Sequence, residues 1–93
     1  MDEQLVDASF ERNLVLVKEL LKSGVDVNSR DSHSSTALEY AAMFGEVEMV
    51  GLLIGSGADV NTINNDGETS LYCAVDDGHT AIEKMLREAG AVK

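Results

Sequence analysis

The side chains that most often do chemistry in proteins are few in this sequence, and their spacing assembles no reactive site. A metal site shared by the two histidines, His33 and His79, would also need carboxylates at a fixed geometry, so we expect both to be structural. Cys73 is the only cysteine, which excludes an internal disulfide and a cysteine-built zinc site. No basic neighbour or helix N-terminus is placed to activate its thiol, and we expect Cys73 to pack rather than react.

Adjacent carboxylates at Asp76 and Asp77 suggest paired acid–base chemistry at first sight. Adjacent residues on a helix point apart, however, and the sequence implies no enclosed cleft around them. The glycines recur at the ends of expected helices and do not form a phosphate-binding loop. We therefore predict no catalytic residue, no cofactor site and no metal site, and we expect that the protein is not an enzyme.

Composition narrows the remaining functions. The chain has 93 residues, enough for one domain, with 7 Lys and Arg against 17 Asp and Glu and a formal net charge of −10. An acidic surface disfavours binding to nucleic acids or anionic membranes. No uncharged stretch is long enough to span a bilayer, and the N-terminus has neither the basic flank nor the apolar core of a secretion signal. We expect an intracellular protein, in the cytoplasm or nucleus.

The elements that would position these residues follow from an internal repeat. A shift of 33 positions superimposes the sequence on itself, with three copies near 1–30, 31–63 and 64–93 in a single domain over 1–93. The identical columns are Leu5, Leu38 and Leu71; Ala8, Ala41 and Ala74; Leu20, Leu53 and Leu86; and Gly24, Gly57 and Gly90. Apolar spacing within each copy predicts two short amphipathic helices, at 3–11 and 14–22, 36–44 and 47–54, and 69–77 and 80–89.

Local signals mark where these helices begin and end. Thr36 and Glu39 have the spacing of a capping box, and Thr69 is placed to cap without a box partner. In the first copy Arg12 stands where the other copies have a glycine between the helices. We expect the neighbouring Asn13 to adopt the left-handed conformation there.

Two stretches carry a family resemblance: Asp66-Gly67-x-Thr69-x-Leu71-x-x-Ala74, and Leu52-Leu53-x-x-x-Gly57-Ala58-Asp59-Val60-Asn61. With their counterparts in the other copies, they resemble the ankyrin repeat over essentially the whole chain. The resemblance implies an all-α fold, a helix-turn-helix solenoid with extended, β-hairpin-like arms between the repeats.

The resemblance also has implications for single residues. The family's Thr-Pro-Leu-His appears as Thr36-Ala37-Leu38-Glu39 and Thr69-Ser70-Leu71-Tyr72, and the missing prolines and histidines should weaken the stack. Asn28 and Asn61 match a pattern that can be hydroxylated in such families. Their plainer role is a side-chain hydrogen bond that steadies the arm.

Both ends of the stack carry polar residues where the middle copy is apolar. Asp7 and Glu19 replace Tyr40 and Leu52 in the first copy, and Glu83 and Arg87 replace Val50 and Ile54 in the last. Glu83 also fits a capping box with Thr80. We expect a complete three-repeat unit with capping ends. A regulatory or structural fragment of a larger protein and an engineered binder remain alternatives.

The resemblance implies a concave groove lined by the arm tips and by the last turns of the first helices. Phe10, Met43 and Phe44 lie in it, outside the inward Leu/Ala face, and we expect them to anchor a partner. The full set of expected partner-binding residues is Phe10, Glu11, Ser32, His33, Ser35, Met43, Phe44, Asn65, Asp66, Glu68, Asp76 and Asp77. We expect a monomer that binds another protein with a basic surface.

Overall fold

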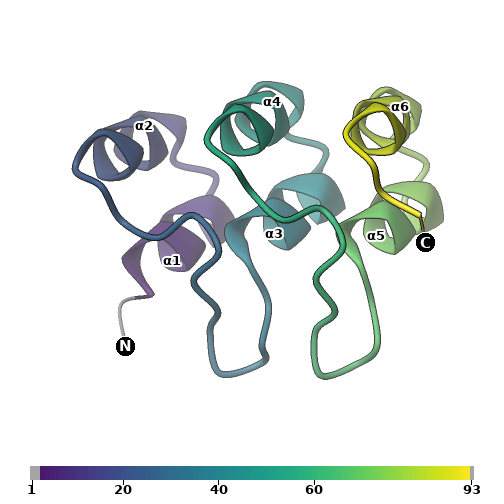
Figure 1. The fold of residues 1–93 in the computed structure, drawn as a ribbon, viewed down its shortest axis with the longest axis horizontal. Coiled ribbons are helices and arrows are strands. Elements are labelled where there is room, and N and C mark those ends of the chain that lie inside the picture. The colour runs from purple at the N-terminus through teal and green to yellow at the C-terminus, as the bar shows by residue number, and fades with distance from the viewer. Residues whose placement is uncertain (1–2, 93) are drawn as a thin grey trace.

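Three helix pairs stand side by side, and two long loops project from the same edge of the row (Figure 1). The computed structural model describes residues 3–92. Its six helices are α1 (Gln4–Phe10), α2 (Leu14–Lys22), α3 (Ala37–Phe44), α4 (Val47–Gly55), α5 (Ser70–Asp76) and α6 (Thr80–Glu88). Residues 3–92 contain no strand, so the predicted all-α repeat fold is confirmed. Each predicted helix lies within one residue of the observed bounds at either end.

The helix N-termini follow the predicted capping chemistry. The Thr36 hydroxyl accepts a hydrogen bond from the Glu39 N–H at 3.3 Å, and the Glu39 carboxylate accepts one from the Thr36 N–H at 3.1 Å. Thr69 caps α5 by accepting from the Tyr72 N–H at 3.1 Å. These bonds satisfy backbone donors that a helix leaves free in its first turn.

Two local predictions are wrong. Arg12, not Asn13, takes the left-handed conformation between α1 and α2, with φ of 60°. The Asn13 side chain instead caps α2, accepting from the Leu16 N–H at 3.1 Å. Glu83 forms no capping box with Thr80, because α6 begins at Thr80 with its N-cap at His79; Glu83 pairs with Arg87 at 3.1 Å.

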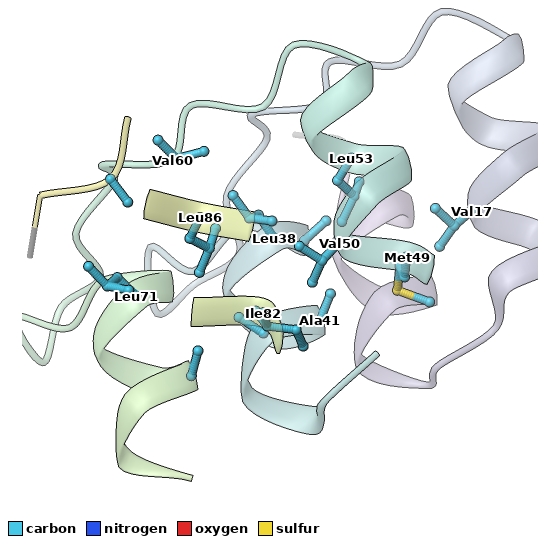
Figure 2. Close-up of a cluster of buried hydrophobic side chains, with 14 of the residues drawn as sticks. Val17, Leu38, Ala41, Met49, Val50, Leu53, Val60, Leu71, Ile82 and Leu86 are labelled. Atoms are coloured by element: carbon cyan, nitrogen blue, oxygen red, sulfur yellow. The ribbon is translucent and has the colours of Figure 1, made fainter. Parts of the chain in front are cut away.

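One hydrophobic core runs along the stack, and its residues face inward between neighbouring copies (Figure 2). Leu38, Leu53 and Leu86 are each at most 1% exposed. α3 packs against α1, α4 and α5, whereas α4 also contacts α2 and α6. Helices this short are marginal alone in water, so contact between adjacent copies supplies most of their stability.

The outer face of the first copy is polar in part. Asp7 and Glu19 are exposed there, as the repeat columns predict. Leu16 and Leu20 are only partly buried, however, and help to line a cavity of about 220 Å³ between α1 and α2.

The arms between helix pairs are joined by bonds that recur at the repeat spacing. The Asn28 side chain accepts from the Asp59 N–H at 2.7 Å, and Asn61 accepts from the Val92 N–H at 3.1 Å. Each asparagine therefore steadies the backbone of the next copy, which is the plainer of the two roles that the sequence offered. Arg30 adds a third link by donating to the Ile63 carbonyl at 2.9 Å.

Glu39 is a buried carboxyl that links two copies. Its side chain is 1% exposed and accepts from the Thr36 N–H within its own copy. Its second oxygen accepts from the Thr62 hydroxyl of the following arm at 3.1 Å. Burial raises the pKa of Glu39 above its ordinary value, although both hydrogen bonds and the nearby Arg30 oppose the shift.

Candidate partner-binding surface

Three aromatic rings, from Phe10, Tyr40 and Phe44, meet across the junction between the first and second copies. We call them the aromatic cluster. Phe10 ends α1, while Tyr40 and Phe44 lie one turn apart on α3 and so share a face. Phe10 meets the other two rings edge to face, at centroid distances of 5.2 Å to Tyr40 and 5.6 Å to Phe44. Such pairs are favourable by about 0.5–1.5 kcal/mol beyond their buried area.

The aromatic cluster remains open to solvent. The Phe10 side chain is 55% exposed, and Tyr40 and Phe44 are partly buried. The ring planes of Tyr40 and Phe44 are inclined by 15° with their centroids 6.3 Å apart, so these two rings are stacked. Ordered aromatic side chains with open faces are the residue type that most often anchors a protein partner.

A cation of the chain itself already rests on the aromatic cluster. The guanidinium carbon of Arg12 lies 5.1 Å from the centroid of the Phe44 ring. The left-handed backbone at Arg12 turns the chain between α1 and α2 at this point. The cluster is therefore compatible with a guanidinium on a ring face.

Asp31 fixes the first arm against α3. One carboxylate oxygen accepts from the backbone N–H groups of His33 at 2.9 Å and Ser35 at 3.0 Å, and the other accepts from the Tyr40 hydroxyl at 2.7 Å. Burial alone would raise the pKa of Asp31, but these hydrogen bonds outweigh it and lower the pKa below its ordinary value. Asp31 therefore remains an anion beside the aromatic cluster.

A cavity of about 260 Å³ opens between α1, the first arm and α3. We call it the acidic pocket. Two residues of the aromatic cluster, three acidic residues and a few neighbours line it: Glu3, Val6, Asp7, Phe10, Asp31, Ser32, His33 and Tyr40. Apolar rings and negative charge thus share one concavity.

The tip of the second arm lies against the tip of the first. The Asn65 N–H donates to the His33 carbonyl at 3.0 Å, and its side-chain amide donates to the Ser32 carbonyl at 3.4 Å. The second arm is held by Asn64, in the column of Asp31, which accepts from the N–H groups of Asp66 and Glu68. The two tips form one edge of the surface.

The expected partner-binding residues fall into different settings. Glu11, Ser32, His33, Asn65, Asp66, Asp76 and Asp77 are exposed, and Glu68 is half-buried. Ser35, expected at an exposed tip, is only 5% exposed and donates its backbone N–H to Asp31, so it is not part of the candidate surface. Met43 is partly buried, and its backbone carbonyl lies 3.1 Å from Nε2 of His79.

Sequence reasoning missed Tyr40 and Asp31, which join the rings to the arm. Tyr40 shares a repeat column with Asp7 and Cys73, and this column faces the groove side of α1 and α3. Asp31 and Asn64 share another column, and both are residue types that often accept from backbone N–H groups in tight turns. Either signal was available from the repeat alignment.

The described residues include no group of three or more His, Cys, Asp or Glu side chains placed to hold a metal ion. Cys73 is buried, and burial, with a smaller contribution from nearby carboxylates, raises its thiol pKa to about 12. A thiol with that pKa is almost entirely protonated at neutral pH and is a poor nucleophile. The His79 ring packs over Gly45, and its Nε2 lies 3.1 Å from the Met43 carbonyl.

Comparison with known proteins gives the chain its relatives. The family model described as ankyrin repeats in three copies matches residues 5–93. An ankyrin repeat protein of fowlpox virus (strain NVSL) is 42% identical over 52 residues, which are 55% of this chain and 8% of the viral protein. The potassium channel AKT2/3 of Arabidopsis thaliana is 39% identical over 49 residues, 53% of this chain and 6% of the channel. Across residues 3–92, every helix is too short or too polar to cross a membrane.

Proposed function

This chain belongs to the ankyrin-repeat family, whose repeats are generally protein–protein interaction modules, and on that premise we propose that it binds a partner protein through its concave surface. The observation that supports the proposal most is the aromatic cluster, which is ordered by ring contacts yet leaves Phe10 55% exposed. On a monomer, exposed apolar patches tend to be binding sites.

In this proposal the stacked helices present a preformed surface, and a few side chains supply most of the affinity. Phe10 and Phe44 are the anchors, and Met43 contributes from the neighbouring position on α3. Selectivity comes from polar and charged residues that follow the groove, namely Glu11, Ser32, His33, Asn65, Asp66, Glu68, Asp76 and Asp77. With a net charge of −10, the chain favours a partner with a basic surface.

The proposed role is non-catalytic and monomeric, and we place it inside the cell, in the cytoplasm or nucleus. The single cysteine supports this compartment, because small secreted domains usually rely on disulfides. The buried thiol of Cys73, with its pKa of about 12, gives no support to a nucleophilic function.

The proposal is tested by Phe44→Ala. Partners are first captured with the wild-type chain, identified and purified, and the affinity of each is then measured by calorimetry. We expect the substitution to weaken binding by about 2 kcal/mol, or roughly 30-fold, as for an aromatic anchor. Arg87→Ala is the matched control, because Arg87 is exposed on α6, away from the groove, and should leave the affinity unchanged.

Phe44 also contacts its neighbours within the chain, so the thermal midpoint and helicity of the same variant must be measured. A folded Phe44→Ala protein that retains full affinity would refute the proposed surface. An unfolded Phe44→Ala protein would show that Phe44 is a packing residue, and the groove would then lose its central anchor.

A further inference from the structure

The acidic pocket combines features that single out one kind of ligand group. Two aromatic residues, Phe10 and Tyr40, and three acidic residues, Glu3, Asp7 and Asp31, are among those that line it. Aromatic faces and carboxylates both attract cations, whereas an anion would meet repulsion from every charged wall. Of the lining residues, His33 alone can carry a positive charge, and only when it is protonated.

The size of the acidic pocket suits one side chain. Its volume of about 260 Å³ lies just below the roughly 300–1,000 Å³ of pockets that enclose whole small molecules. The pocket opens beside the first arm tip, so a side chain could enter while its backbone follows the edge formed by Ser32 and Asn65.

The negative charge in the acidic pocket is preset by hydrogen bonds. The Asp31 carboxylate is fixed by the Tyr40 hydroxyl at 2.7 Å and by two backbone N–H groups, and these bonds favour its ionised form. Asp7 is exposed on α1, one turn before Phe10. Carboxylates on α1 and on the arm thus stand on different sides of the cavity, which matches a planar group with several donors better than a single point charge.

The chain already holds one guanidinium of its own against Phe44, the third ring of the aromatic cluster. Arg12 places its guanidinium 5.1 Å from the Phe44 centroid, on the same aromatic cluster. We propose that the acidic pocket receives the side chain of an arginine from the partner protein, with its guanidinium against Phe10 and Tyr40 and paired with Asp7 and Asp31. This inference rests on the proposed function and specifies the partner's chemistry at one position.

The test uses short capped peptides and the full chain labelled with ¹⁵N. Acetyl-Gly-Ser-Arg-Ser-Gly-amide is titrated while the backbone amide resonances are followed, and the same peptide with citrulline in place of arginine is the control. Citrulline keeps the shape and loses the charge. We expect the arginine peptide to shift the amides of Phe10, His33 and Tyr40 with half-saturation at roughly 1–10 mM, and citrulline to shift them at least tenfold less.

Two variants test the two walls of the acidic pocket. Asp7→Asn should lower the affinity for the arginine peptide at least threefold, whereas Glu88→Gln, which removes an equal charge from the exposed end of α6, should leave the affinity unchanged. Phe10→Leu retains an apolar side chain and removes the ring, and it should also weaken the peptide at least threefold. A far-UV spectrum verifies that each variant is folded.

A third peptide carries lysine in place of arginine. Three results would overturn the inference: arginine and citrulline peptides that shift the same amides equally, shifts spread over all acidic residues, or a lysine peptide that binds more tightly than the arginine peptide. These results are separable from failure of the proposed function. If the arginine peptide shifts no amide resonances while Phe44→Ala still lowers the affinity for a purified partner, the arginine site is refuted and the proposed groove is supported. If the peptide binds as expected while Phe44→Ala leaves the partner affinity unchanged, the arginine site is supported and Phe44 is refuted as an anchor.

Discussion

Glu39→Gln should make the protein more stable at neutral pH, although it replaces a fully hydrogen-bonded side chain. A glutamine at this position can keep both bonds: its oxygen can accept from the Thr36 N–H, and its amide can donate to the Thr62 hydroxyl. It differs from the native side chain by carrying no charge at a site that is 1% exposed. Because burial raises the pKa of Glu39, the folded state prefers the neutral form, which glutamine resembles.

The pH dependence fixes the sign of the effect. A carboxyl whose pKa is higher in the folded state than in the unfolded state stabilises the fold at pH values below its unfolded pKa, here the ordinary 4.5. That stabilisation is lost as the pH rises through the pKa of the folded state. Wild type and Glu39→Gln should therefore have similar stability near pH 4 and diverge in favour of glutamine towards pH 7. Asp31 acts in the opposite direction because its pKa is lowered, but it is present in both proteins and cancels in the difference.

The assay is urea denaturation at pH values from 4 to 7.5, with two further variants. Glu39→Ala removes both hydrogen bonds and leaves the buried Thr36 N–H without its carboxylate, so it should cost about 2–4 kcal/mol. Glu88→Gln removes one charge from an exposed position and measures the general relief of repulsion in an acidic chain. The reasoning is refuted if Glu39→Gln is less stable than wild type at pH 7, or if its advantage is no larger than that of Glu88→Gln.

Two matched pairs of substitutions test the backbone. Gly45→Ala should lower the free energy of unfolding by about 2–4 kcal/mol, because a Cβ there would lie 2.7 Å from Cε1 of His79. Gly78→Ala, at the same φ of 75° but with no atom within 4 Å of the added Cβ, should lower it by only about 1–2 kcal/mol. Equal losses in denaturant titration would show that the His79 contact is unimportant. Ser34→Gly should raise the free energy of unfolding by about 0.5–1 kcal/mol, and with it the thermal midpoint, because it relieves a φ of 59°; the reverse change in the same repeat column, Gly67→Ser at φ of 76°, should lower both. Shifts of the same sign in both variants would contradict this account.

The helices could be placed from sequence because their determinants are local. The apolar spacing and the threonine caps at 36 and 69 each act within a few residues, and the helices and caps were found where expected. The left-handed backbone at Arg12 and the capping role of Asn13 could not be predicted from such local signals. They depend on where each side chain finds a partner, and the Arg12 guanidinium finds one on Phe44, in another copy.

The candidate surface was predictable only in part for the same reason. Phe10 and Phe44 stood out because they lie off the inward face of their helices, and both belong to the aromatic cluster. Met43 satisfied the same criterion and lies next to Phe44 on α3, and its role stays a prediction. Tyr40 was missed because its role depends on the bond between its hydroxyl and Asp31, which the arm brings against α3.

The linkage of each copy to its neighbours has a consequence for how the chain folds. The bonds that join copies, such as Arg30 to Ile63 and Asn28 to Asp59, close loops of about one repeat, and the main helix contacts join elements of the same or adjacent copies. The main native contacts therefore form within one copy or between adjacent copies, and each closes a loop of about one repeat rather than of the whole chain. Any adjacent pair of copies can act as the folding nucleus, with the remaining copy docking onto a template that is already complete.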